Sequence, residues 1–89
     1  MNPHIIVEVL SRTTTRYDLG VKVPRYKTLP SVQHILLVSQ HKPGVSLYSR
    51  TNRPGQWLNI EVQDVENGFV TINRKKLRLA DIYRNSLVE

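Results

Sequence analysis

Apolar positions in the first forty residues follow a strand–helix–strand pattern. Residues 4–10 (HIIVEVL) are β-branched or apolar at odd and even positions alike, except at Glu8. A strand that is apolar on both faces is typical of the doubly covered interior of a parallel or mixed sheet. Residues 13–29 show helical spacing, and residues 35–39 (ILLVS) form a second apolar run of strand length. This order predicts a βαβ unit, in which the two strands are parallel and the crossover is right-handed.

The predicted helix contains a proline. Pro24 deletes a backbone hydrogen bond and clashes with the preceding turn, at a cost of about 3 kcal/mol or more. The polar residues 11–15 can cap the start of a helix. Because of Pro24, we expect the helix to be split or to begin near that residue. Helical spacing places Asp18, Lys22 and Tyr26 on one face.

The second half of the chain changes to short alternating segments separated by turns. The strand-like segments are residues 45–50, 56–63 and 69–72, the turns are residues 51–55 and 67–68, and a short terminal helix covers residues 79–83. The first two strands predict a hairpin, and the helix should turn Leu79, Ile82 and Tyr83 inward. The predicted fold class is α/β (an α+β mixed sheet), in which a βαβ unit is followed by antiparallel strands and a short C-terminal helix.

Composition narrows the classes of function. The 89 residues contain no cysteine, which excludes disulfides, thiolate metal sites and cysteine nucleophiles. The apolar runs are far shorter than the ~18 to 20 residues that cross a bilayer, so we expect no membrane partner and a cytoplasmic location. The net charge of +6, from 13 Lys and Arg against 7 Asp and Glu, favours a polyanionic partner such as DNA.

The first strand has too little cover. An interior strand needs packing on both faces, and one long helical segment and one short one do not supply it. We therefore expect residues 1–89 to form a single partial domain. It would be completed by a missing N-terminal half or by association as a homo-oligomer.

Three segments carry a resemblance to a known family. Residues 2–11 (NPHIIVEVLS), 17–22 (YDLGVK) and 29–33 (LPSVQ) resemble the Uma-type restriction endonuclease family of the PD-(D/E)XK nuclease superfamily. Further similar segments occur in the family's order at residues 36–40, 55–57 and 79–83. The resemblance implies a partial restriction-endonuclease-like fold, that is, a truncated member without the N-terminal half that carries the metal-binding Asp.

Glu8 is the first candidate for catalysis. Metal-assisted phosphodiester hydrolysis needs oxygen ligands for Mg²⁺, and an ionised carboxylate in an apolar strand is costly without a metal or a basic partner. The resemblance implies that Glu8 is the catalytic acid and a metal ligand, and that the Val9 carbonyl is a second ligand. The alternative is a Glu8 side chain that reaches solvent at a sheet edge or pairs with an arginine.

Lys22 is the second candidate. The superfamily places a lysine two residues after the acid, but Leu10 occupies that position here. Lys22 matches a lysine that the Uma-type pattern carries on the following helix, so the resemblance implies a catalytic base or an electrostatic stabiliser. The alternative is a surface pair with Asp18, four residues earlier, worth about 0.3 to 0.5 kcal/mol.

Residues 74–78 (RKKLR) are the densest basic cluster. If they are extended, Arg74, Lys76 and Arg78 share one face at intervals of about 6.6 to 7 Å and could follow DNA phosphates. The alternative is an edge strand whose charges prevent sheet-to-sheet association.

Two hypotheses about function follow. The first is the C-terminal part of a Mg²⁺-dependent DNA endonuclease-like domain, inactive or weakly active alone because one carboxylate holds Mg²⁺ poorly. The second is a noncatalytic remnant that binds DNA or another protein.

Overall fold

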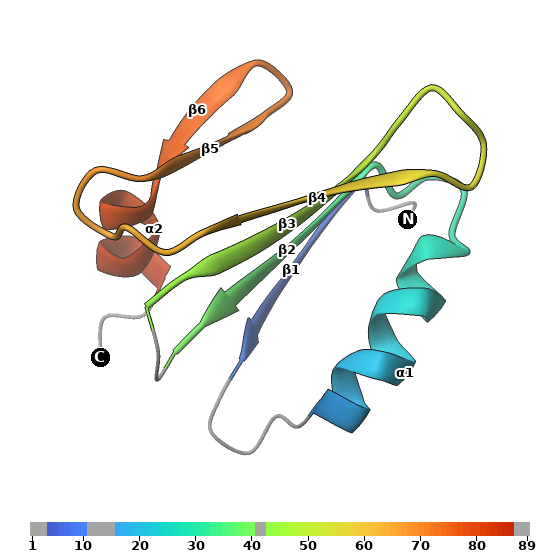
Figure 1. The fold of residues 1–89 in the computed structure, drawn as a ribbon, viewed down its shortest axis with the longest axis horizontal. Helices are drawn as coiled ribbons and strands as arrows, with labels where there is room; N and C mark the ends of the chain where they lie inside the picture. Colours follow the sequence, from blue (N-terminus) through green and yellow to red (C-terminus); the bar gives the residue numbers. More distant parts are fainter. Residues whose placement is uncertain (1–3, 11–15, 41–42, 87–89) are drawn as a thin grey trace.

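The computed structural model describes residues 4–10, 16–40 and 43–86 (Figure 1). The elements in this part of the chain are, in order, β1 (Ile5–Leu10), α1 (Arg16–Lys27), β2 (His34–Ser39), β3 (Val45–Arg50), β4 (Trp57–Val62), β5 (Phe69–Ile72), β6 (Lys75–Arg78) and α2 (Leu79–Ser86). None of the helices described there is long and apolar enough to cross a membrane. The caps expected at residues 11–15 lie outside the described residues.

The strands form a mixed sheet and a separate hairpin. The sheet has the order β1-β2-β3-β4, and β5 pairs with β6 in a second, two-stranded sheet. β1 and β2 are parallel, whereas the β2–β3, β3–β4 and β5–β6 pairs are antiparallel. The predicted α+β class, the βαβ unit and the hairpin of residues 45–63 are therefore confirmed.

The four-stranded sheet is covered on both faces (Figure 1). On one face, α1 packs through a cluster of Val23, Val32, Ile35 and Leu37. On the other face, the β5–β6 hairpin and α2 enclose a cluster of Leu36, Val38, Val45, Leu47, Val70, Ile72 and Leu79. Ile82 and Tyr83 pack against this second cluster, as the sequence predicted for the terminal helix.

The prediction that residues 5–10 form an interior strand is wrong for this structure. β1 has one neighbour among the described strands, and β2 takes the interior position instead. Alternate side chains of β1, those of Ile5, Val7 and Val9, remain 37%, 56% and 40% exposed. The composition of a strand reports the surfaces it can bury, whereas its place in the sheet depends on which strands pair with it.

The expected break at Pro24 is also wrong, because α1 runs through it. A helical proline crowds the carbonyl of the residue four positions earlier, which here is Gly20. The helix persists because its packing on the sheet offsets this crowding. Burial of Val23 and packing of Leu19 and Tyr26 against the sheet hold the helix in place.

Arg50 fixes the end of α1 to the sheet. Its Nε donates to the Val32 carbonyl at 2.9 Å, and its guanidinium also donates to the Leu29 carbonyl at 3.1 Å. The same guanidinium lies 4.4 Å from the ring centroid of Trp57. β3 therefore positions the loop that leads from α1 into β2, and with it the helix face that meets the sheet.

Residues 74–78 are only partly extended. Asn73 and Arg74 have φ values of 53° and 68°, and two consecutive positive φ values are typical of the tight type I′ turn of a hairpin. Arg74 therefore lies in the turn between β5 and β6, and not in line with Lys76 and Arg78 on a strand.

The turn predicted at residues 67–68 is confirmed, since the Gly68 N–H donates to the Asp64 carbonyl at 2.7 Å.

Candidate active site

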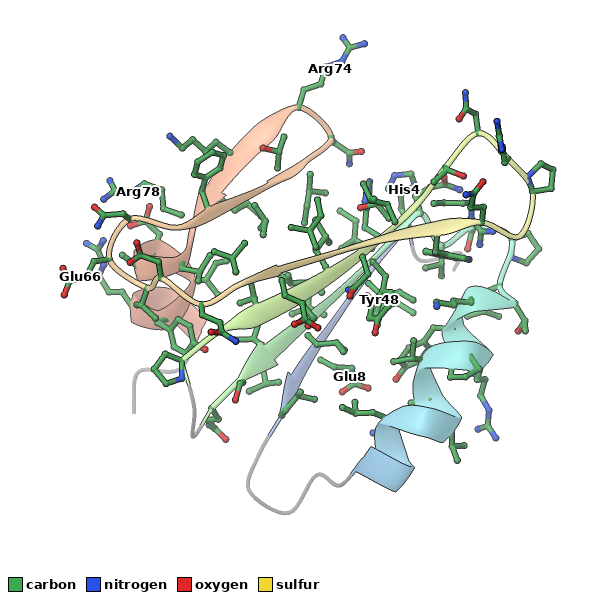
Figure 2. The ribbon with its side chains drawn as sticks, in the orientation of Figure 1. His4, Glu8, Tyr48, Glu66, Arg74 and Arg78 are labelled. Carbon is green, nitrogen blue, oxygen red and sulfur yellow. The ribbon has the colours of Figure 1, made fainter. Side chains whose placement is uncertain are left out.

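Glu8 projects from β1 into the space between the sheet and α1 (Figure 2). The Tyr26 hydroxyl donates a short hydrogen bond to its Oε1. The Lys22 Nζ lies 3.6 Å from the same oxygen. The Glu8 side chain is 24% exposed, so this is a partly buried carboxylate with one cationic and one neutral partner.

The βαβ connection explains this arrangement. Lys22 and Tyr26 lie four residues apart on α1, so both occupy the same face. Val23, also on α1, packs against Ile35 and Leu37 of β2. This packing brings the face that carries Lys22 and Tyr26 over β1, where Glu8 lies.

The sequence prediction placed Glu8 and Lys22 at one site, and the structure brings them together. Their catalytic and metal-binding roles stay predictions. The Asp18 side chain lies outside the part of the chain that the structure describes, so the alternative Asp18–Lys22 pair stays open. Tyr26 was missed as a site residue. The signal was available, since it shares the helix face of Lys22.

The hydrogen bond changes the acidity of Tyr26. The pKa of its phenol is raised above the usual value of 10.0, first by the hydrogen bond to Glu8, then by burial, and then by the negative charge of Glu8. The nearby Arg25 charge opposes this rise. Tyr26 therefore stays protonated and keeps donating to the carboxylate over a wide pH range.

Tyr26→Phe should lower the free energy of unfolding by about 1 kcal/mol at neutral pH, because it removes a partly buried hydrogen bond to a charged group. When the pKa of a tyrosine is higher in the folded state than in the unfolded state, its protonated phenol stabilises the fold. This stabilisation is complete at pH values below the pKa of the unfolded tyrosine. That contribution is lost as the pH rises through the folded pKa. The difference between Tyr26→Phe and the unsubstituted protein should thus be constant from neutral pH to pH 10.0 and shrink above it.

Urea unfolding at a series of pH values measures this difference. Tyr48→Phe is the matched control, because in the described part of the chain no hydrogen bond of the Tyr48 hydroxyl is seen. A Tyr26→Phe effect equal to that of Tyr48→Phe at every pH would show that the Glu8 contact contributes nothing.

Cations and aromatic rings line the same face of the sheet. The Lys27 Nζ lies 4.5 Å from the ring centroid of Tyr48 and 5.7 Å from that of Trp57. Both rings pack against the core under α1, so packing on the sheet accounts for them. Beside Tyr48 lies an open hollow of about 310 Å³, lined in part by Ser46 and Glu61.

A magnesium site at β1 would need several oxygen ligands. Both contacts of Glu8 reach Oε1, and no contact of Oε2 is seen within the described residues. The Leu10 carbonyl accepts from the Gln40 N–H at 2.9 Å and so faces β2. Because backbone direction alternates along a strand, the Val9 carbonyl faces the open edge of the sheet.

Mg²⁺ takes about six oxygen ligands, and it is usually held by one or two carboxylates together with waters. Glu8 Oε2 and the Val9 carbonyl are oxygen atoms of the kind that Mg²⁺ binds. The described side chains include no group of three or more His, Asp or Glu that could complete a protein-only site.

The basic cluster lies away from Glu8. Every residue of β6 is exposed, and the Lys76 Nζ lies 4.3 Å from the ring centroid of Phe69. The register pairs Phe69 with Arg78, so Lys76 and Arg78 point outward on the same face of the hairpin. Figure 2 shows Arg74 at the tip of the hairpin. The hairpin covers the sheet face opposite α1, so the structure does not bring Arg74, Lys76 and Arg78 to the Glu8 site.

Comparison with known proteins shows the family to which this chain belongs. Residues 1–74 match the Uma2 family, whose description is "Putative restriction endonuclease", and the chain belongs to this family. Uncharacterized protein slr1290 of Synechocystis sp. is 41% identical over 61 residues, which cover 68% of this chain and 32% of that protein. Uncharacterized protein sll1609 of the same organism is 33% identical over 75 residues, which cover 80% of this chain and 42% of that protein. The chain thus matches less than half the length of either relative.

Proposed function

We propose that this chain is part of a Mg²⁺-dependent DNA endonuclease-like domain that contains Glu8 as its acidic residue. The observation that carries the proposal is the meeting of Glu8, the single acid of an otherwise apolar strand, with Lys22 from the following helix at 3.6 Å. A carboxylate can hold a divalent metal, and a nearby ammonium group can offset negative charge on a phosphate, so the pair suits metal-assisted phosphodiester hydrolysis. Membership of the Uma2 family supports the same hypothesis of a nuclease-like domain.

Each residue has a distinct role in this proposal. Glu8 and the Val9 carbonyl hold Mg²⁺, which supplies Lewis acidity and an activated water when it is bound. Lys22 is 52% exposed and can reach a phosphate group, where its charge would offset negative charge that develops during hydrolysis. Tyr26 holds the Glu8 carboxylate in one orientation through its hydrogen bond.

The isolated chain should be weakly active at most. A single carboxylate leaves Mg²⁺ bound mainly to water, and weak binding lowers the fraction of molecules that carry the metal. The activity and DNA target of the longer relatives belong to this proposal as well, since the matched segments cover a minority of their lengths.

A second candidate function is DNA binding without cleavage. The exposure of Lys76 and Arg78 on β6 and of Arg74 at the turn favours it, because exposed cations bind phosphates by releasing counterions. Their location on the face opposite Glu8 means that binding through them would not deliver DNA directly to the carboxylate.

A supercoiled-plasmid nicking assay with Mg²⁺ tests the nuclease proposal. We expect slow nicking that Glu8→Gln abolishes and that Glu61→Gln leaves unchanged. Glu61 is the matched control, because it is an exposed acid in line with Glu8 across the same face of the sheet. Nicking that persists in Glu8→Gln would contradict the proposal.

The same protein samples distinguish DNA binding without cleavage from nuclease activity. If Arg74, Lys76 and Arg78 contact phosphates, their joint replacement by alanine should lower the slope of log K against log salt by about 2.7, since each contact contributes ~0.9. Binding without nicking, with this change in slope, would favour the noncatalytic function.

A further inference from the structure

The β5–β6 hairpin has an inward and an outward face. Val70 and Ile72 of β5 are buried in the cluster beneath the hairpin, so strand alternation directs the other residues of this strand outward. With the residues paired to them on β6, the outward face consists of Phe69, Thr71, Lys76 and Arg78. Figure 2 shows Arg74 at the turn of the hairpin, where its side chain points away from the sheet.

This outward face and the turn are positively charged. They carry Arg74, Lys76 and Arg78, and residues 69–78 contain no acid. Within the part of the chain that the structure describes, none of the three cations pairs with a carboxylate. A protein segment could cover these charges only by supplying anionic partners, because burying unpaired cations is costly. The face is therefore suited to water or to an anionic ligand.

Arg74 occupies an unusual backbone position. Its φ of 68° lies in the left-handed region, which residues with a side chain enter at a cost in free energy. The second central position of a type I′ turn usually holds glycine for this reason. Ile72, which is buried directly before the turn, fixes the turn to the core. The guanidinium group of Arg74 is thus presented from an anchored turn.

The cost of this conformation has no visible compensation in the fold, since Arg74 forms no ion pair with the described residues. Strained backbone positions of this kind are concentrated at sites of function. A function that needs an arginine at the tip of the hairpin would account for the residue at this position.

We propose that the outward face of the hairpin lies along the major groove of duplex DNA, where the guanidinium group of Arg74 contacts a guanine. A two-stranded ribbon fits this groove, which is about 12 Å wide, because its strands are only about 4.8 Å apart. Guanine presents the acceptors O6 and N7 in the major groove, and the planar fork of an arginine donates to both. This inference rests on the second candidate function, DNA binding through these cations, and not on nuclease activity.

Lys76 and Arg78 have a different role in this arrangement. Both project from β6 beside the turn, where they contact the phosphates that border the groove, and such contacts add affinity without base preference. Their joint replacement by alanine should lower the slope of log K against log salt by about 1.8, since each phosphate contact contributes ~0.9. The preference for guanine should remain.

Fluorescence anisotropy of a short labelled duplex tests the guanine contact. The measurement is made in EDTA, so that cleavage does not interfere. A matched duplex carries 7-deazaguanine, which lacks the N7 acceptor but keeps its base pairing. We expect the unsubstituted protein to bind the guanine duplex about fivefold more tightly, which is the low end for a bidentate contact. Arg74→Lys should abolish this difference and keep the salt dependence, because it retains the charge but not the fork.

Thermal unfolding gives a second readout with the opposite sign. Arg74→Gly should raise the midpoint of unfolding by about 2 to 4 °C, because glycine adopts a positive φ without strain. The same variant should bind DNA more weakly and lose the preference for guanine. Arg53→Gly is the matched control, since Arg53 is an exposed arginine in the turn between β3 and β4 and its φ is not positive. It should lower the midpoint and leave the preference for guanine unchanged.

Four results would overturn the inference. These are the absence of DNA binding, equal affinity for the guanine and 7-deazaguanine duplexes, a guanine preference that survives in Arg74→Lys and Arg74→Gly, and tighter binding of single-stranded DNA than of the duplex. The first result would also reject the second candidate function, whereas the other three would leave it standing.

Discussion

Replacing Leu47 with alanine should lower the free energy of unfolding by about 2 to 5 kcal/mol, the usual cost of a large-to-small change in a core. Leu47 is 1% exposed at the middle of β3. It packs in the cluster that joins the sheet to the hairpin and α2, together with Leu36, Val70 and Leu79. Truncation would leave a cavity that the strands on either side of β3 prevent from collapsing.

The expected loss is large for a chain of this size. Domains have roughly 0.05 to 0.15 kcal/mol of stability per residue, or about 4 to 13 kcal/mol for 89 residues. The midpoint of thermal unfolding should fall by about 8 °C or more. Leu58→Ala on β4 is the control, since a half-exposed leucine should cost much less. A loss below about 1 kcal/mol for Leu47→Ala would contradict the described core.

Local pattern was sufficient to predict most elements. The apolar run of residues 35–39 is β2, and the alternating runs of residues 45–63 are β3 and β4. The order of strand, helix and strand also predicted that β1 and β2 are parallel. These features depend on side-chain periodicity within each segment, which can be read from the sequence directly.

The positions of elements in space were less predictable. β1 has the composition of an interior strand, yet it lies at an edge, because strand order is set by long-range pairing. α1 continues through Pro24 because Val23, Leu19 and Tyr26 pack against the sheet and hold the helix. The turn at Asn73 and Arg74 was missed because its second residue is not glycine, the usual signal of such a turn.

The candidate site was only partly predictable, because local sequence pattern identifies single residues but not the contacts between distant segments. Glu8 stands out as the one acid in an apolar strand, and Lys22 came from the family resemblance. The contact of Tyr26 with Glu8 joins residues 18 positions apart and depends on how α1 lies across β1. Helical spacing indicated that Tyr26 shares the face of Lys22, but not that this face meets the acid.

Glu8→Gln should abolish specific binding of a divalent cation at β1. Mn²⁺ is a suitable probe, since it takes the same kind of oxygen ligands as Mg²⁺ and its unpaired electrons broaden nearby amide signals in NMR spectra. The neutral amide of Gln keeps the shape of Glu8 but removes the charge that attracts the metal. Glu61→Gln is again the matched control, because it removes an equal charge from the same sheet face.

In the proposed function, Glu8 and the Val9 carbonyl form the metal-binding part of a nuclease-like site. Titration of Mn²⁺ into ¹⁵N-labelled protein measures this directly, without the need for catalytic activity. We expect broadening centred on Glu8, Val9 and Lys22, present in Glu61→Gln and absent in Glu8→Gln. Broadening centred instead on the acidic turn of Asp64 and Glu66, or unchanged by Glu8→Gln, would contradict the claim.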